Sequence, residues 1–400
     1  MSLISTFDNM KIDVLMVSRT FLPMEGGIEE YVYNRCLQDP DRIVVLAANC
    51  PGADEFDRLQ PFLVYRWPNP KILKKILFGG LIKQFICLFW SFVISIKLYQ
   101  KHRYQYLEWG HGYDFLSLLI LGYLLPIKYI VYLHGNDLLC PLKNSLLKSV
   151  FSLTLKRASC IVCNSSFTKE YLTSNFLFLT PVQVINPGVR PEKFGLSFGE
   201  YPDPVSVKAV RYQCNIPDHA ILILSVGRLV KRKGFDRMIA QLPALVDKGL
   251  DVHYLVCGRG AMEGELQELA QQLGMGSRVH FAGYVPDVEL GNYYAACDVF
   301  AMLTFFDATA ASIEGFGIVY VEAGFFGKPV IASRVGGVVD AVHHLQNGLL
   351  VEPTSPTDLL DALSQLCADA DLRERLGKTG QAFAKRQPSY QALYPSVISA

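Results

Sequence analysis

Short apolar runs with the pattern of buried strands alternate with helix-like segments along nearly all 400 residues. Such alternation predicts parallel sheets, because one parallel strand reaches the next through a crossover helix that covers a face of the sheet. The first expected strand, 13–18, leads through Gly26-Gly27 into an expected helix at 28–36. Further strands of this first run are expected at 43–47, 106–109, 129–133, 160–163 and 182–185.

A second run of the same pattern begins with a strand expected at 220–226, after a stretch of prolines and glycines with little periodicity. A chain of this length exceeds one typical domain. The interrupted alternation therefore predicts an α/β protein of two Rossmann-like domains. The second run has further strands expected at 252–256, 279–281, 299–302, 330–332 and 348–351, and helices at 359–366 and 372–384.

The two runs set the predicted boundaries. Residues 1–190 form an N-terminal Rossmann-like domain, 191–218 a linker, and 219–385 a C-terminal Rossmann-like domain. Residues 386–400 are predicted to form a C-terminal helix that returns to the first domain. In open α/β sheets ligands bind beyond the carboxyl ends of the strands, so two such domains facing each other would place the site in the cleft between them.

Charge and cysteine content exclude several classes of protein. A formal net charge of +1 argues against an extended nucleic-acid surface. Cys160 and Cys163 form a lone C-x-x-C inside an expected strand, so buried core cysteines are favoured over a zinc site. The start of the chain lacks the pattern of a secretory signal, which makes the reducing cytoplasm the expected compartment.

Two apolar stretches, 85–96 and 115–125, invite a test for membrane spans. Neither reaches the roughly 18–20 uncharged residues that a spanning helix needs, so both are expected to be core helices. A second interpretation concerns the preceding segment, 71–83, which mixes four lysines with aliphatic residues. As an interfacial basic amphipathic segment, it would give peripheral contact with a membrane.

The segment 314–322 carries two carboxylates eight residues apart, Glu314 and Glu322, with Gly315-Phe316-Gly317 just after the first. A helix that begins at such a glycine break offers free N–H groups and a positive dipole end to a phosphate. Each carboxylate can accept hydrogen bonds from a diol. One diol on a sugar and one on a ribose, with phosphates between them, describe a nucleotide sugar. An ordinary loop-to-helix junction is the alternative.

A basic loop follows the strand expected at 220–226. Arg228 lies at the end of that strand, and Lys233 lies five residues further on, before an expected helix. A guanidinium fork and an ammonium group can neutralise a diphosphate leaving group without a metal. The alternative is a solvated basic loop, and we assign Lys231 and Arg232 to that role.

Two motifs of the first domain also lie at expected strand ends. His134-Gly135 ends the strand 128–133, where an imidazole can contact a substrate hydroxyl or share a proton. Gly26-Gly27 follows the first strand and can admit a phosphate, although a simple turn explains it equally well. Asp39-Pro40-Asp41 has a metal-binding form but falls in an expected surface turn, so neither a metal nor a cofactor is predicted.

Taken in chain order, these motifs resemble the retaining glycosyltransferases of family 4, whose GT-B architecture consists of two Rossmann-like domains facing across a cleft. The resemblance spans nearly the whole chain, and the pairing of E-x7-E with an upstream G-R-L-x-x-x-K-G is its most specific part. Residues 304–323 are similar to bacterial α-mannosyltransferases that act on phosphatidylinositol mannosides, although the loop 305–312 lacks the expected arginine and glycines. The motifs are 26–27, 134–135, 164–166, 186–194, 227–234, 283–286 and 314–322.

The resemblance implies a role for each matching residue. Glu314 would hold the hydroxyls of the donor sugar and His134 would contact that sugar from the first domain. Arg228 and Lys233 would stabilise the departing diphosphate. The implied donor-binding residues are Gly26 and Gly27 at the phosphate, Tyr284 and Val285 at the base, Gly315, Phe316 and Gly317 at sugar and phosphate, and Glu322 at the ribose.

The implied function is a retaining, metal-independent transfer of an α-hexosyl group, mannose or glucose, from a nucleoside-diphosphate sugar such as GDP-mannose or UDP-glucose. The N-terminal domain would bind the acceptor, a hydroxyl of a lipid-linked or polysaccharide precursor, on the cytoplasmic side of the cell membrane. Attack would come from the same face as departure, with the leaving phosphate accepting the proton.

Two other classes would share the nucleotide site. A GT-B sugar-nucleotide epimerase or hydrolase needs no sugar acceptor. A non-catalytic nucleotide-binding module would be expected to lack Arg228, Lys233 or Glu314, and all three are present.

Overall fold

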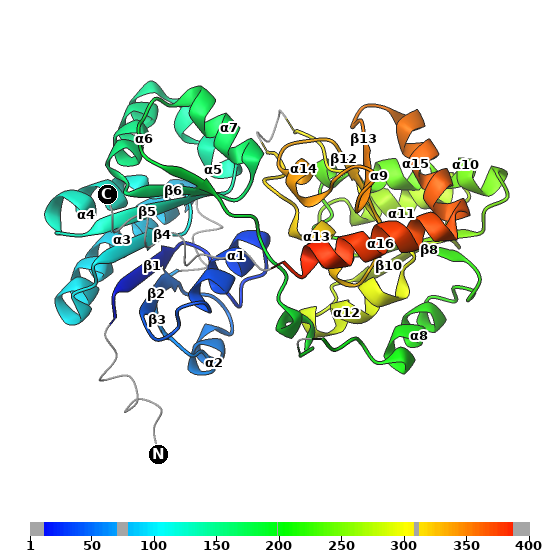
Figure 1. Ribbon diagram of the computed structural model, residues 1–400, viewed down its shortest axis with the longest axis horizontal. Helices are drawn as coiled ribbons and strands as arrows, with labels where there is room; N and C mark the ends of the chain where they lie inside the picture. The colour runs from blue at the N-terminus through cyan, green and yellow to red at the C-terminus, as the bar shows by residue number, and fades with distance from the viewer. Residues whose placement is uncertain (1–11, 70–78, 198, 308–311, 387–400) are drawn as a thin grey trace, which may run out of the picture. The chain divides into compact units, whose positions relative to one another are not determined.

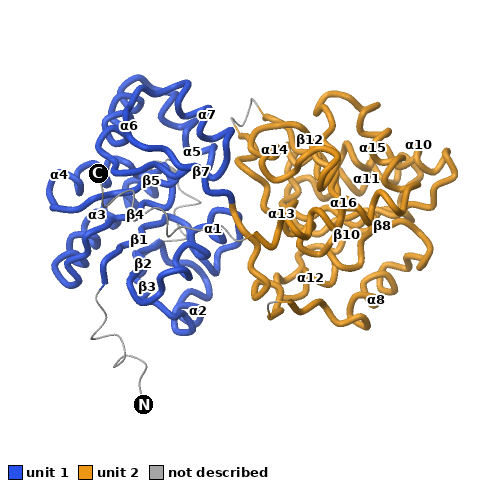
Figure 2. The backbone as a smooth tube through the Cα atoms, in the orientation of Figure 1, with its two compact units in different colours: residues 1–186, 389–400 blue, residues 187–388 orange. Residues whose placement is uncertain are grey.

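The computed structural model describes residues 12–69, 79–197, 199–307 and 312–386. The chain divides into two compact units, which Figure 2 shows in different colours. Unit 1 comprises residues 1–186 and 389–400, and unit 2 comprises residues 187–388. Each unit is a parallel sheet with helices packed against it (Figure 1). The predicted fold class, two Rossmann-like α/β domains, is confirmed.

Seven parallel strands form the sheet of unit 1, in the order β3-β2-β1-β4-β5-β6-β7. All six strands expected from the sequence are present to within one residue at each end. The sequence pattern does not reveal β3, an edge strand whose side chains are mostly half-buried and include Arg66. The strands are β1 (Val14–Ser18), β2 (Ile43–Ala48), β3 (Leu63–Trp67), β4 (Tyr106–Trp109), β5 (Lys128–Leu133), β6 (Cys160–Cys163) and β7 (Val182–Val184).

Helices cover both faces of this sheet. Alternate residues of β1 point to opposite faces: Leu15 packs with residues of α3, α4, α6 and α7, whereas Met16 packs with residues of α1. Cys160 and Cys163 are buried on opposite faces, as expected for core cysteines. The helices of unit 1 are α1 (Gly27–Cys36), α2 (Ala53–Arg58), α3 (Gly79–His102), α4 (Phe115–Leu124), α5 (Asn136–Leu139), α6 (Ser145–Arg157) and α7 (Ser166–Asn175).

A buried ion pair joins α1 to β4 inside unit 1. The side chains of Arg35 and Glu108 are both 0% exposed and meet through two hydrogen bonds, of 3.0 and 2.7 Å. The Tyr132 hydroxyl donates to the same carboxylate at 2.7 Å, and Asp39 accepts from Arg35 at 2.9 Å. Buried charges are tolerated only when they are paired in this way. Asp39 of the Asp-x-Asp turn is therefore one partner of a structural arginine.

Six parallel strands form the sheet of unit 2, in the order β10-β9-β8-β11-β12-β13. All six correspond to strands expected from the sequence. They are β8 (Ile221–Val226), β9 (Val252–Cys257), β10 (Val279–Gly283), β11 (Val299–Met302), β12 (Val330–Ser333) and β13 (Gly348–Val351).

Residues 191–218, predicted as a linker, belong to unit 2 and carry helical structure. A single 3₁₀ turn, η4, spans Pro191–Phe194, and helix α8 spans Pro204–Gln213. Asp203 caps α8 by accepting from the Ser206 N–H, and a proline suits a first helical turn. Two of the four prolines in this stretch, Pro191 and Pro204, thus begin helical elements. The helix predicted at 386–400 lies, apart from Arg386, outside the described residues.

The two helices expected near the C-terminus, at 359–366 and 372–384, are present. These two and the remaining helices of unit 2 connect and cover its strands. They are η5 (Lys231–Lys233), α9 (Phe235–Ile239), α10 (Leu242–Asp247), α11 (Glu263–Gln272), α12 (Asp287–Ala296), α13 (Ile318–Phe325), α14 (Val338–Ala341), α15 (Pro356–Ala368) and α16 (Ala370–Ala384).

In both sheets the strand order changes direction beside the first strand of the unit, between β1 and β4 and between β8 and β11. Ligands of open α/β sheets bind at the carboxyl ends of the strands near such a switch. The segments that follow β1, β5, β8, β10 and β11 carry the predicted site motifs, so each unit brings its own motifs to one edge of its own sheet.

A stacked histidine pair ties β9 to β10. His253 Nδ1 lies 3.0 Å from His280 Nε2, and the ring centroids are 5.3 Å apart. Burial, aided by the charge of His253, lowers the pKa of His280 to about 4. Burial likewise lowers the pKa of His253, with a further contribution from Arg278.

This pair predicts a pH dependence of stability. Because the pKa of His280 is depressed in the folded protein, the unfolded chain binds more protons once the pH falls below about 6.5. The effect of His280 on the free energy of unfolding is therefore absent above pH 6.5, and the free energy of unfolding falls as the pH drops from 6.5 to about 4. In urea unfolding at a series of pH values, His280→Gln should flatten this loss. His219→Gln, which replaces an exposed histidine, should keep the wild-type slope; equal flattening in both would contradict the assignment.

Candidate functional site

The basic loop after β8 converges on Glu314. Lys233 Nζ donates to Glu314 Oε2 at 2.7 Å, and Arg232 Nη1 donates to the same oxygen at 3.0 Å. Gly234 makes this possible: its φ is +71°, and a Cβ there would lie 2.2 Å from the Leu303 carbonyl oxygen. Arg232 is therefore not the solvated loop residue that the sequence suggested, because it shares a carboxylate with Lys233.

Two cations keep Glu314 ionised. Burial alone would raise the pKa of this carboxyl, but the charges and hydrogen bonds of Lys233 and Arg232 outweigh it and lower the pKa to about 2. The Glu314 side chain retains 14% of its surface exposed. Glu314 can therefore accept further hydrogen bonds as a permanent anion, but it is too weak a base to take a proton near pH 7.

Arg228 differs from its two neighbours in the loop. It is exposed, and although its backbone carbonyl accepts from the Val230 N–H at 2.8 Å, its guanidinium group forms no hydrogen bond or ion pair with any residue that the structure describes. Its guanidinium group is consequently available to an anion that approaches the end of β8.

Glu322 sits in a much drier environment. It lies within α13 and is 1% exposed, and its two oxygens have separate partners. Lys193 Nζ donates to Oε1 at 2.6 Å, and the Tyr294 hydroxyl donates to Oε2 at 2.8 Å. Lys193 Nζ also lies 3.7 Å from Asp287. The structure thus shows Glu314 and Glu322 with separate sets of partners.

The glycine break between the two carboxylates starts α13. Gly317 precedes the helix with a φ of +87°, and a Cβ there would lie 2.4 Å from the Tyr320 ring. Phe316 is 3% exposed and belongs to the core, so only its backbone can meet a ligand. Gly315 is half-buried beside it. Close by, the Gly337 N–H donates to the Glu314 carbonyl at 3.0 Å.

The loop after β10 presents one aromatic ring. Tyr284 is 42% exposed, and the Arg259 guanidinium lies 5.4 Å from its ring centroid. Val285, the other residue predicted to hold a base, is 9% exposed. The accessible surface of this loop is therefore the Tyr284 ring with Arg259 over it, and Arg259 is a residue that the sequence did not single out.

In unit 1, His134 follows β5 and is held from several sides. Its backbone N–H donates to Asp137 at 3.0 Å, and its Nε2 lies 2.9 Å from the Gly110 carbonyl oxygen. Because a carbonyl only accepts, Nε2 must carry the proton. Burial lowers the pKa of His134 against the opposing influence of Asp137. The neutral ring then leaves Nδ1 as an acceptor, and Tyr31 packs edge-on against it at 5.2 Å.

Gly26 and Gly27 lie where the sequence placed them, at the start of α1. A Cβ added to Gly26 would lie 2.2 Å from a carboxylate oxygen of Glu29, so this acidic side chain folds back onto the helix start. Glu30 adds a second carboxylate to the first turn. The N-terminus of α1 therefore faces carboxylates of its own, and it is less favourable for an anion than a bare glycine turn would be.

The same edge of unit 1 carries a cluster that the motifs did not reveal. The Arg19 side chain, just after β1, forms two hydrogen bonds to Asp114 at 3.0 and 2.5 Å. Its backbone N–H donates to His111 Nε2 at 2.6 Å. Burial, with the charges of Arg19 and His134, lowers the pKa of His111 to about 3. The sequence did not predict this cluster, because Arg19 is far from His111 and Asp114 along the chain. The order of the strands in the sheet brings them together.

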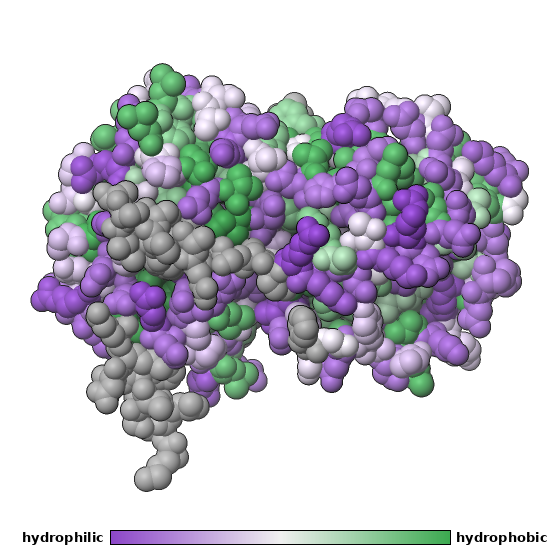
Figure 3. Space-filling model, in the orientation of Figure 1, coloured by the Kyte–Doolittle hydropathy of each residue, from purple (hydrophilic) through white to green (hydrophobic). Residues whose placement is uncertain are grey.

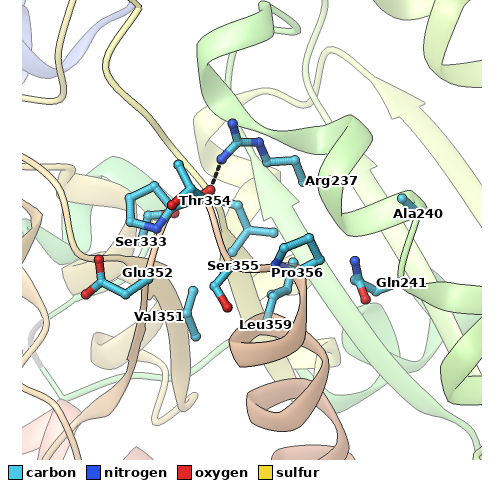
Figure 4. A pocket seen from close by; sticks show the side chains of 12 residues that line it. Arg237, Ala240, Gln241, Ser333, Val351, Glu352, Thr354, Ser355, Pro356 and Leu359 are labelled. Atoms are coloured by element: carbon cyan, nitrogen blue, oxygen red, sulfur yellow. Dashed lines mark hydrogen bonds between the residues drawn. The ribbon is translucent and has the colours of Figure 1, made fainter.

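Among the described residues, no group of three or more histidines, cysteines and acidic residues could hold a metal ion. A cavity of about 390 Å³ lies beyond β12 and β13, and Arg237 in its lining donates to the Pro353 carbonyl; Figure 4 draws this bond as a dashed line. Arg237 also lies over the Phe305 ring, with 4.1 Å to the centroid. The cavity lining includes none of the predicted site residues.

Two family models match the chain. The model described as Glycosyltransferase Family 4 matches residues 25–193, and the model described as Glycosyl transferases group 1 matches residues 207–383. Together they span most of both units.

Known proteins are similar over nearly the whole chain. A GDP-mannose-dependent alpha-(1-6)-phosphatidylinositol monomannoside mannosyltransferase of Mycobacterium tuberculosis is 27% identical over 391 residues, 95% of each chain. The structure of Anabaena HepE in complex with UDP superposes with a TM-score of 0.77 at 20% identity, covering 97% of this chain and 100% of that one. Sucrose-phosphate synthase from Thermosynechococcus elongatus gives a TM-score of 0.75 at 21% identity, covering 96% and 99%. At these identities the two structures support the fold.

The buried pair of Lys193 and Glu322 predicts a coupling energy. Lys193→Met leaves a buried carboxylate without its cation and should destabilise unit 2 by about 3 kcal/mol. Adding Glu322→Gln removes the stranded charge, so the double variant should lose less than the sum of the single losses. Urea unfolding of the four proteins measures the difference. Lys208→Met, at an exposed lysine, is the control. Additive losses would show that the pair contributes nothing specific.

Proposed function

The chain belongs to the group 1 and family 4 glycosyltransferases, which transfer hexose from a nucleotide sugar, and on that premise we propose a finer activity. It moves an α-hexosyl group, with retention and without a metal, to a hydroxyl of a lipid-linked or polysaccharide precursor. The observation that carries this proposal is the pair of carboxylates at one edge of unit 2, Glu314 under two cations and Glu322 in a buried site.

The proposal assigns the two carboxylates to the two diols of a nucleotide sugar. Glu314 accepts hydrogen bonds from the sugar hydroxyls through the part of its surface that stays exposed, and Glu322 accepts from the ribose. The ribose then has to take the place of Lys193 at Glu322 Oε1, and Asp287 lies near enough to receive the displaced ammonium group. The Tyr284 ring, with Arg259 over it, offers a stacking surface for the base.

Charge neutralisation of the leaving diphosphate falls to Arg228 and Lys233. Arg228 is exposed and unpaired among the described residues, and Lys233 already lies in the loop that holds Glu314. The backbone N–H groups at Gly315, Phe316 and Gly317 precede α13 and add donors for sugar and phosphate. Negative charge develops on the diphosphate as it leaves in the transition state. Positive groups that are already in place beside the diphosphate therefore lower the activation barrier.

The low pKa of Glu314 bears on the route. A carboxylate held at a pKa of about 2 cannot act as the general base for the acceptor hydroxyl. The departing phosphate, which gains negative charge as the glycosidic bond breaks, is the better proton acceptor. Attack on the face from which the diphosphate leaves then retains the anomeric configuration.

In unit 1 we assign His134 to the donor sugar, where its neutral Nδ1 can accept a hydrogen bond from a hydroxyl. Gly27, beside Gly26, is assigned to the phosphate through its backbone. Glu29 and Glu30 at the same helix start make a hydroxyl-rich partner more favourable there than a second anion.

The relatives favour mannose as the sugar and a lipid as the acceptor. The M. tuberculosis relative is named as GDP-mannose-dependent and as acting on phosphatidylinositol monomannoside. HepE, similar in fold, was solved with UDP, so UDP-glucose is the second donor to test. A sugar-nucleotide epimerase or hydrolase keeps the same donor site, and products formed from donor alone separate that class from a transferase.

Turnover without a divalent metal is the first prediction here. With GDP-mannose or UDP-glucose and a phosphatidylinositol-mannoside or polyprenyl-linked acceptor, one donor should give a glycosylated product whose anomeric signal in NMR has the donor configuration. EDTA should leave the rate unchanged, because Arg228 and Lys233 supply the positive charge. Inverted product, donor consumption without acceptor, or activity restored only by magnesium or manganese would each count against the proposal.

The two carboxylates should also divide donor binding. Glu322→Gln should weaken binding of the free nucleoside diphosphate by about tenfold to 150-fold, the usual cost of a lost hydrogen bond to a charged group. Glu314→Gln should change that affinity little while reducing turnover strongly. Calorimetric titration measures the first quantity and initial rates the second, with thermal unfolding as a check on folding. Equal effects on nucleotide affinity contradict the division.

A further inference from the structure

Helix α3 exposes an apolar stripe that its sequence suggested would be buried. The stretch 85–96 was expected to be a core helix too short to span a membrane, yet α3 extends it to a helix of 24 residues. Its segment Ile82–His102 is long and apolar enough to cross a membrane by length and composition, and only 22% of the apolar window within it is buried. A core helix of a soluble protein can have the same length and composition. The burial of the individual side chains of α3 therefore distinguishes a packed helix from an exposed one.

The buried and exposed residues of α3 lie on opposite sides. Cys87, Ser91, Ser95 and Leu98 recur at helical spacing and are all nearly fully buried against unit 1. The side chains of Ile82, Phe85 and Phe89 form the opposite stripe and are 40%, 70% and 48% exposed. Because one side of α3 is packed onto the sheet, the helix lies along unit 1 with an apolar outer face.

Helices α4 and α6 continue this face. The Ser117 hydroxyl of α4 donates to the Leu88 carbonyl of α3 at 2.7 Å, and Arg157 of α6 donates to the Gly122 carbonyl of α4 at 3.1 Å. The three helices therefore form one layer. Figure 3 shows apolar side chains gathered over α6, at the upper left of the molecule. The exposed apolar residues of the other two helices are Leu116, Ile120, Tyr123 and Leu124 on α4, and Leu146, Leu147 and Leu153 on α6.

The charges on this layer are one-sided. Residues 79–157 contain nine lysines and arginines and three acidic residues. All three acids are withdrawn from the surface: Glu108 is 0% and Asp137 1% exposed, and the Asp114 side chain is 4% exposed in its pair with Arg19. Residues 12–69 of the same unit show the reverse balance, with nine acidic residues and five arginines. Six of the nine cations lie on the helical layer itself: Lys83, Lys97 and Lys101 on α3, and Lys148, Lys156 and Arg157 on α6.

We propose that the outer face of α3, α4 and α6 is a docking surface for an anionic lipid bilayer. Exposed aromatic and aliphatic side chains bordered by lysines and arginines are the features with which interfacial helices bind such a surface. A second copy of this chain is the other apolar partner to consider, but pairing the face with itself would bring like charges together. The bilayer satisfies both the apolar stripe and the positive charge. The sequence suggested the same role for the segment 71–83. Its residues 71–78 lie outside the described residues and carry no part of this argument, whereas Ile82 and Lys83 belong to α3.

The proposal does not depend on glycosyl transfer, and its test uses the full chain without donor or acceptor. Flotation with vesicles of phosphatidylcholine containing about a third phosphatidylglycerol measures the bound fraction, and pure phosphatidylcholine vesicles are the comparison. The wild-type protein should bind the anionic vesicles at least tenfold more tightly, and added salt should weaken that binding.

Two double variants separate the apolar and the charged contributions. Phe85→Ser/Phe89→Ser and Lys148→Glu/Lys156→Glu should each reduce binding to anionic vesicles at least tenfold while melting like the wild type, because all four side chains are exposed. Leu59→Ser and Lys208→Glu change an exposed leucine and an exposed lysine elsewhere, and should bind like the wild type.

Three results overturn the proposal. The first is wild-type protein that stays unbound to anionic vesicles at low salt. The second is an equal loss of binding in the control variants. The third is light scattering that shows a dimer which Phe85→Ser/Phe89→Ser dissociates, since the face would then join two copies of the chain.

Discussion

Parallel pairing of the strands decides where chemistry can take place in this chain. Every strand of both sheets runs in one direction within its sheet, so all loops that leave the carboxyl ends gather at a single edge. In unit 2 this brings the loop of Lys233 to Glu314, although 81 residues separate them in the sequence. In unit 1 it brings Arg19 to His111. The remaining features of each site are refinements of this one constraint.

The two carboxylates of unit 2 show one residue type in two different environments. Glu314 keeps part of its surface exposed beneath two cations and remains charged at any physiological pH. Glu322 is enclosed, with one lysine and one tyrosine satisfying its two oxygens. A ligand can add to the first arrangement, whereas it has to replace a partner in the second. In the structure Glu322 is therefore fully partnered, by the Lys193 ammonium group and the Tyr294 hydroxyl.

The sequence predicted most of the strands but few of the side-chain contacts between distant residues. Twelve of the thirteen strands follow from apolar runs, because buried parallel strands are continuously apolar. Strand β3 was not predicted because it is a half-buried edge strand and therefore lacks a continuous apolar run. Helix α8 was not predicted because its first residue, Pro204, and the capping Asp203 are residue types that are also common in linkers.

Side-chain partners were the harder part of the site. Glu314, Glu322 and Lys233 come from a local motif, but the pairing of Arg232 with Glu314 and of Lys193 with Glu322 spans 82 and 129 residues. Hydropathy also predicts that α3 is apolar without saying which side faces the sheet. Its exposed stripe appears only once Cys87 and Leu98 are seen to be packed.

The ten cysteines differ in their exposure to solvent, and one of them is accessible to chemical labelling. Of ten free thiols seven are buried, and burial raises the pKa of those at Cys163 and Cys257. Only Cys140 is exposed, at the end of the short helix α5 and six residues beyond His134. Because an exposed thiol is the most accessible to a reagent, we expect an alkylating dye to react first at this position, ahead of the half-buried Cys50 and Cys214. The native chain thus carries an exposed attachment point for a fluorophore, six residues beyond His134.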